Sequence, residues 1–122
     1  MHDERQKFYG EWQALSGVLA GAAMAEEIVS ATKLTLMENA YAVNLAGAID
    51  CGLCEIHPQE TPVQMKVVGQ HGPNVGKTFF AIVEFLEADQ IRIAYDLSGT
   101  EYPGSFEPSS APTSYVATFR RA

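Results

Sequence analysis

Polar and apolar residues alternate along most of the chain in short runs, the period-two pattern of β-strands that bury one face. The pattern predicts strands at residues 9–18, 33–38, 41–45, 52–57, 63–69, 77–86, 91–95 and 115–121. Glu38 and Asn39 form the turn of the first hairpin. Residues 96–113 are rich in proline, glycine and serine, which indicates a loop with a short edge strand around Ser105 and Phe106.

An alanine-rich stretch at residues 19–31 contains the one helix that the pattern predicts, a short one around residues 24–29, and residues 1–8 form a polar lead-in. In the first strand, Trp12, Ala14 and Ser16 share one face. About eight short strands at regular spacing predict an all-β fold, an antiparallel up-and-down barrel with one short helix. The residues expected to point inward are Trp12, Leu34, Leu36, Tyr41, Val43, Met65, Val67, Ile91, Ile93, Tyr95, Tyr115 and Phe119.

The strand at residues 77–86 is apolar on both faces, with Phe79, Ala81, Val83 and Phe85 on one and Phe80, Ile82 and Leu86 on the other. An apolar outer face on a barrel needs a cover. The short helix is one candidate for that cover, and a second subunit is the other.

The length of 122 residues fits a single domain, residues 1–122, with a core of its own. The formal net charge of −7, with only 8 lysines and arginines, disfavours nucleic acid and anionic membrane surfaces as partners. The charged amino terminus is followed by no apolar run, so the sequence as written predicts neither a signal peptide nor a membrane span. We therefore expect a cytoplasmic location.

The segment HGPNVGKTFF, residues 71–80, has some likeness to the phosphate-binding loop of nucleotide hydrolases. That loop has four residues between its glycines and is followed by a helix. Here Gly72 and Gly76 enclose three residues, and a β-branched and aromatic run follows. The segment is therefore expected to be a turn between two strands.

Cys51, Cys54 and His57 have a spacing that suggests a redox or zinc site. A redox pair belongs at a helix N-terminus, and the pattern predicts no helix here. In an extended segment the two sulfurs point to opposite faces, unless a bulge at Gly52 intervenes. Zinc would need a fourth ligand, for which only His2 and His71 remain. We expect ordinary thiols, no metal and no cofactor.

The chain has no arrangement typical of catalysis. No serine lies in a G-x-S-x-G turn, and the three histidines fall in a tail and two expected turns. Glu26 and Glu27 lie on the short helix, where paired acids are usually solvated. The sequence does not predict an enzyme.

Gly10, Glu11 and Trp12 open the first strand, and Arg120 and Arg121 end the last. This resembles the G-x-W and terminal arginine of the lipocalin and wider calycin families, in which the arginine packs across the tryptophan and closes one end of the barrel. Arg121 shares a face with Phe119, so we favour Arg121 over Arg120 for this role.

The segments GEWQALSG, TKLTL, GPNVGKTFFAIVEF, IRIAYDLSGTEYPGSFEP and ATFRR resemble, in this order, a small lipocalin-like domain of unknown function that is abundant in planctomycete bacteria. The resemblance covers roughly residues 9–121 and implies a calycin-type barrel, with no established activity to carry over. Two positions depart from the family's pattern: Tyr102, where arginine is usual, and Ala94, where cysteine is frequent.

An eight-stranded barrel is just wide enough to be filled by side chains or to hold one small ligand. We expect a small apolar ligand in the interior, in a cavity that opens opposite Trp12 and Arg121. The hydroxyls of the three tyrosines among the expected contact residues would orient the ligand. These residues are Tyr41, Val43, Met65, Val67, Ile93, Tyr95 and Tyr115. The alternative is a filled core in a protein-interaction or homodimerisation module.

Overall fold

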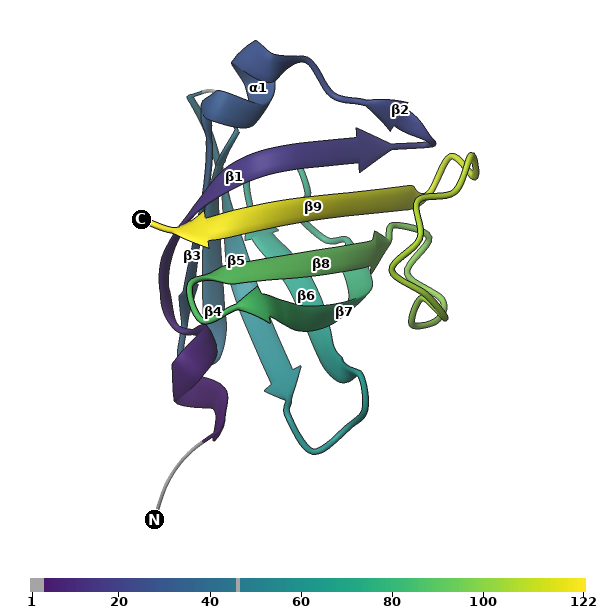
Figure 1. The fold of residues 1–122 in the computed structure, drawn as a ribbon. Helices are drawn as coiled ribbons and strands as arrows, with labels where there is room; N and C mark the ends of the chain where they lie inside the picture. The colour runs from purple at the N-terminus through teal and green to yellow at the C-terminus, as the bar shows by residue number, and fades with distance from the viewer. Residues whose placement is uncertain (1–3, 46) are drawn as a thin grey trace.

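The computed structural model describes residues 4–45 and 47–122, which form nine strands, one α-helix and one 3-10 helix (Figure 1). The strands are β1 (Gly10–Leu19), β2 (Ala22–Ala23), β3 (Thr32–Met37), β4 (Ala40–Leu45), β5 (Ala48–His57), β6 (Val63–His71), β7 (Thr78–Glu87), β8 (Gln90–Asp96) and β9 (Ser114–Arg121). The 3-10 helix is Glu4–Phe8 and α1 is Glu26–Ser30.

Neighbouring strands pair antiparallel in the order β1-β3-β4-β5-β6-β7-β8-β9, and pairing of β1 with β9 closes the sheet into an eight-stranded barrel. The two-residue β2 adds to the end of β1. The predicted all-β antiparallel barrel with one short helix is therefore confirmed. Residues 1–3, which include His2 and part of the expected lead-in, lie outside the described residues.

Three local predictions need correction. The helix begins at Glu26 rather than residue 24, because the Met24 N–H donates to the Gly17 carbonyl and continues the β1–β2 pairing (2.8 Å). Strand β5 begins at Ala48, four residues before the expected start at residue 52. The predicted edge strand at residues 105–106 is wrong, since the described connection from β8 to β9 contains no strand, and prolines within it cannot donate to a ladder.

Strand β1 contains a bulge that shifts its inward face. Its register with β9 slips between Ala14 and Ser16, so Ser16 is exposed and Gly17 is buried, contrary to the expected alternation. Pairing with β3 covers only Gly10–Gln13. Beyond that point α1 lies beside β1, and the Gln13 side-chain amide donates to the carbonyls of Ser30 and Thr32 (3.1 Å each).

One end of the barrel, which we call the closed end, is filled by the 3-10 helix and aromatic side chains. Phe8 is buried, so the lead-in is only partly the polar segment that was expected, and its ring lies 5.0 Å from that of Phe85. The Trp12 indole N–H donates to the Phe8 carbonyl (3.0 Å). The Arg121 guanidinium lies 4.1 Å from the Trp12 ring centroid and donates to the carbonyl of Tyr9 (2.8 Å).

Arg121, which faces the interior as expected, makes this contact, whereas Arg120 is exposed. The second terminal nitrogen of the Arg121 guanidinium donates to the Lys7 carbonyl (2.7 Å), which ties the last strand to the 3-10 helix. Gly10 has a φ of 123°, and a Cβ there would lie 3.0 Å from the guanidinium. The positive φ therefore favours glycine here, and a larger residue would also crowd the guanidinium.

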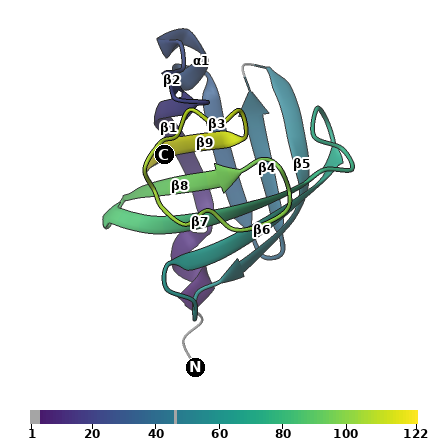
Figure 2. The same ribbon diagram turned by 90° about the vertical axis from the view of Figure 1, so that its right-hand side faces the viewer.

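The outer face of β7 is covered by the chain's own β8–β9 connection, which Figure 2 shows crossing in front of the neighbouring strands. Ile82, Ala94 and Val116 form a small outer cluster, against which Tyr102 and Phe106 pack. The chain's own loop thus supplies a cover that the sequence did not suggest, where the short helix and a second subunit were the candidates. The inner face of β7, which begins at Phe79, contributes to the main core.

Candidate functional site

The barrel interior contains a cavity of about 210 Å³. All eight barrel strands contribute to its lining, which is mostly aliphatic and aromatic. The lining reaches Leu19, Leu45 and Leu97 at the end opposite Trp12 and Arg121, and Leu19 is 40% exposed. We call this end, together with Asp50 and Asn74, the open end.

Six of the seven residues expected to contact a ligand line this cavity, namely Tyr41, Val43, Met65, Val67, Tyr95 and Tyr115. Ile93 does not. It is fully buried between Val83 and Ala117 on the neighbouring strands. Ile93 shares the inner face with Tyr95 but lies two residues, about 7 Å, nearer the closed end, where side chains fill the interior.

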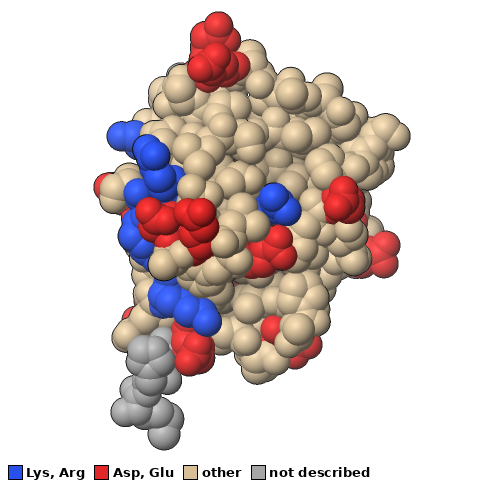
Figure 3. Space-filling model, viewed as in Figure 1, with Lys and Arg blue, Asp and Glu red and all other residues tan. Residues whose placement is uncertain are grey.

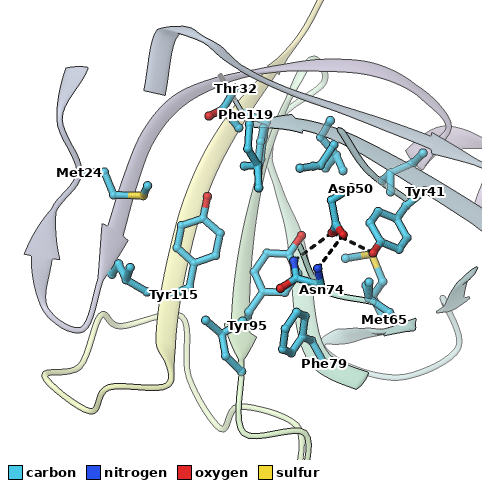
Figure 4. A pocket seen from close by; sticks show the side chains of 17 residues that line it. Met24, Thr32, Tyr41, Asp50, Met65, Asn74, Phe79, Tyr95, Tyr115 and Phe119 are labelled. Atoms are coloured by element: carbon cyan, nitrogen blue, oxygen red, sulfur yellow. Dashed lines mark hydrogen bonds between the residues drawn. The ribbon is translucent and has the colours of Figure 1, made fainter. Parts of the chain in front are cut away.

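The main polar feature of the cavity is Asp50, which sequence reasoning did not single out. Asp50 is only 2% exposed. Its Oδ1 accepts a hydrogen bond from the Asn74 backbone N–H (3.1 Å), and its Oδ2 accepts from the Asn74 side-chain amide (3.0 Å) and from the Tyr41 hydroxyl (3.0 Å). Figure 4 shows this network on one wall of the pocket.

The β6–β7 hairpin brings Asn74 to this wall. Gly69 donates to the Lys77 carbonyl and accepts from the Gly76 N–H, both at 2.9 Å, so the turn folds back on the end of β6. A Cβ at Gly69 would collide with the Asn74 carbonyl. The segment at residues 71–80 contains the predicted turn between two strands. In addition, this turn supplies the polar side chain of Asn74 to the cavity.

A signal for Asp50 was present in the sequence. Inward positions of β5 alternate from Ile56 through Cys54 and Gly52 to Asp50, all of which are buried. Because the strand was expected to begin at residue 52, this inward acid fell outside it. The pairing of β5 with β6 does slip beside Gly52, with Gln70 of β6 as the extra residue.

Tyr95 and Tyr115 form a second polar feature, on β8 and β9, whereas Tyr41 and Asp50 lie on β4 and β5. Tyr95 and Tyr115 are directly paired, and their rings stack with centroids 5.4 Å apart and an angle of 20°. Neither hydroxyl has a hydrogen-bond partner among residues 4–45 and 47–122. In Figure 4 the Tyr115 side chain projects into the pocket beside Met24.

All three tyrosines of the cavity are neutral at physiological pH. Burial raises the pKa of Tyr115 and is the main cause of the raised pKa of Tyr95. Burial, followed by the hydrogen bond to Asp50 and the charge of Asp50, raises the pKa of Tyr41. Each hydroxyl is therefore available as a hydrogen-bonding group and not as a phenolate.

The cysteines lie on opposite faces of β5, as the alternation predicted, and both are free. Burial raises the pKa of the Cys54 thiol to about 12, so this inward thiol is unreactive. Cys51 is half-buried on the outer face. Within the described part of the chain, no three side chains of His, Cys, Asp or Glu come together as a metal site.

The charge of the cavity is negative. Of the described residues that line it, none is a lysine, arginine or histidine, and Asp50 is acidic. On the face shown in Figure 3, basic side chains lie mainly along one edge, near the C-terminus, while acidic ones are spread over the surface. The interior acid is thus part of a chain with a formal net charge of −7.

Comparisons with protein-family models, with curated proteins and with solved structures find no match for this chain. In the part of the chain that the structure describes, no helix is both long and apolar enough to cross a membrane.

Proposed function

We propose that this protein is a non-catalytic binding protein that holds one small, mainly apolar molecule in the open end of its barrel. The observation that carries the proposal is the cavity of about 210 Å³, lined by aliphatic and aromatic side chains with a few polar groups among them. Ligand pockets generally combine these two features. An apolar cavity of about 150 Å³ accepts benzene, so the expected ligand has about one ring and a few further atoms.

The barrel fold is compatible with this function, because an eight-stranded barrel either fills its interior with side chains or encloses one small ligand. Here Arg121 closes one end and the cavity lies at the other. The alternative, an interaction or homodimerisation module with a filled core, has less support. The outer face of β7 that motivated it packs against Tyr102 and Phe106 of the same chain.

The proposal is tested by titrating an environment-sensitive hydrophobic dye into the protein and displacing it with single-ring aromatic compounds and short aliphatic ones. The critical variant is Val43→Phe, which adds a ring inside the cavity. Its matched control is Val68→Phe. Val68 lies on the outer face of the barrel, opposite the exposed Leu53, and adds the same atoms outside.

We expect saturable binding near one site per chain, unchanged by Val68→Phe and weakened about tenfold or more by Val43→Phe. Far-ultraviolet circular dichroism confirms that each variant is folded. A folded wild-type protein that binds no compound saturably, or equal binding by both variants, would overturn the proposal.

A further inference from the structure

Asp50 retains one unused hydrogen-bonding position at the cavity. An ionised carboxylate has about four acceptor positions, two on each oxygen. Within the described part of the chain, Oδ2 accepts two hydrogen bonds, from Tyr41 and the Asn74 side chain, whereas Oδ1 accepts one, from the Asn74 backbone. The two Asn74 groups are donors only, so both carboxylate oxygens act as acceptors. The remaining position on Oδ1 fits a further donor.

Among residues 4–45 and 47–122, no cationic side chain forms an ion pair with Asp50. Within the described residues, ion pairs form between Lys7 and Glu4, His57 and Glu55, and Arg92 and Glu84, and none includes Asp50. A buried charge is normally paired or bound to a cation, because removing it from water is costly. The complementary charge is therefore expected from outside the chain.

The remaining walls also favour a cation. The rings of Tyr41, Phe79, Tyr95 and Tyr115 line the same cavity, and aromatic faces attract ammonium groups. Burial is the main cause of the raised pKa of Tyr41 and of Tyr95, and the charge of Asp50 contributes to both. The described lining of the cavity contains no lysine or arginine that would offset this charge for a carboxylate ligand.

Resting on the proposed function, we infer that the ligand is a small primary amine with an apolar body. Its ammonium group donates to Oδ1 of Asp50, and its ring or short alkyl chain occupies the apolar part of the cavity. The volume of about 210 Å³ suits a single ring with a two-carbon arm. The net charge of −7 also favours the approach of cations over anions.

The test uses three probes with the same ring and different end groups: 2-phenylethylamine, 2-phenylethanol and phenylacetate, measured by calorimetry at pH 7.5. A hydrogen bond to a charged partner is the stronger kind, so we expect the amine to bind about tenfold or more tightly than the alcohol. Phenylacetate should bind most weakly. N-acetylation of the amine, which removes its charge, should reduce affinity to that of the alcohol or below.

The matched variants are Asp50→Asn in the cavity and Asp89→Asn in the exposed β7–β8 turn, each of which removes one negative charge. Asp50→Asn should abolish the preference for the amine and retain alcohol binding, while Asp89→Asn should retain both. If Asp50→Asn does not fold, the comparison of the three probes and the N-acetylated amine on the wild-type protein still decides the question.

The possible failures differ. If the alcohol binds as tightly as the amine, or phenylacetate binds more tightly, the amine inference is overturned and the binding function stands. If no probe binds and the dye also fails to bind, the proposed function itself fails. Unchanged amine preference in folded Asp50→Asn contradicts the assignment to Asp50.

Discussion

The two ends of the barrel are built from the same alternating strands but finished differently. At the closed end, Phe8, Trp12 and Phe85 fill the interior, and Arg121 lies over the indole. At the open end the inward side chains leave a cavity, and a hydrogen-bonded acid, Asp50, lies on its wall. A period-two pattern therefore determines which residues face inward, while the size and polarity of those residues determine which end is solid.

The two ends also treat charge differently. The cation of Arg121 has an aromatic ring and two carbonyl acceptors, so the chain itself satisfies it. The anion of Asp50 has three neutral donors and, among the residues that the structure describes, no cation. The first arrangement is complete without a partner, and the second has room for one.

The largest expected effect comes from removing the aromatic plug. Trp12→Ala should lower the free energy of unfolding by about 4 kcal/mol, because it leaves a large void in a filled region. Val43→Ala at the open end should lower it by about 1 kcal/mol, since space beside Val43 is already empty. Urea denaturation measures both. Equal losses would contradict the difference between the ends.

Adding side-chain volume should also lower the free energy of unfolding more at the closed end than at the open end. Ile91 is fully buried at the closed end, between Phe85 and Phe119. Ile91→Phe should therefore cost about 2 kcal/mol through overpacking. Val43→Phe should cost less than about 1 kcal/mol because the cavity accommodates the ring. A larger loss for Val43→Phe than for Ile91→Phe, by the same denaturation assay, would show that the open end is filled.

The adjacent arginines provide a test of the closed end. Arg121→Ala removes the cation–π contact and two charge-assisted hydrogen bonds, and should cost about 1.5 kcal/mol. Arg120 is exposed, so Arg120→Ala should cost less than about 0.5 kcal/mol. Thermal unfolding followed by tryptophan fluorescence compares them. Similar losses for the two variants would remove Arg121 from its assigned role.

The smallest effect at neutral pH should come from the tyrosine pair. Tyr95→Phe should change stability at pH 8 by less than about 0.5 kcal/mol, because a hydroxyl without a protein partner is replaced at little cost. The Tyr95 hydroxyl influences stability at alkaline pH. Since the folded-state pKa is raised, the folded protein holds the proton more tightly and stability falls as the pH rises above about 10.

The loss amounts to at most about 1.4 kcal/mol per pH unit for each such group. Between pH 10 and pH 11, the free energy of unfolding should fall less steeply in Tyr95→Phe and in Tyr115→Phe, because each variant lacks one titrating hydroxyl. Denaturation at each pH measures this slope. An unchanged slope in both variants would show that these hydroxyls are not held in their neutral form.

Much of the barrel was predictable from the sequence, because period-two alternation and turn residues are local signals. The inward parity of Tyr41, Val43, Tyr95 and Tyr115 followed directly. The resemblance to lipocalin-like barrels implied an arginine packed across Trp12, and parity selected Arg121 over Arg120 for that contact, although Trp12 and Arg121 lie at opposite ends of the chain.

Other features depend on contacts that a local pattern does not contain. Phe8 enters the core from a lead-in that is otherwise polar, and Tyr102 and Phe106 cover the outside of β7 from a loop. The bulge in β1 changes the face of Ser16 without a change in composition. Asp50 and Asn74 meet only because the β6–β7 hairpin folds over the barrel end, and the cavity volume is a property of the whole packing.

The most direct test of the account is an NMR titration of the labelled protein with 2-phenylethylamine, followed at two reporters. Trp12 is the only tryptophan, so its indole N–H is a unique signal from the closed end, and the Asn74 side-chain amide reports the open end. We predict a saturable shift of the Asn74 amide and a stationary Trp12 indole. Saturable binding that moves the indole, or only residues of the outer surface such as Leu53, and leaves Asn74 unchanged would contradict a binding site at the open end.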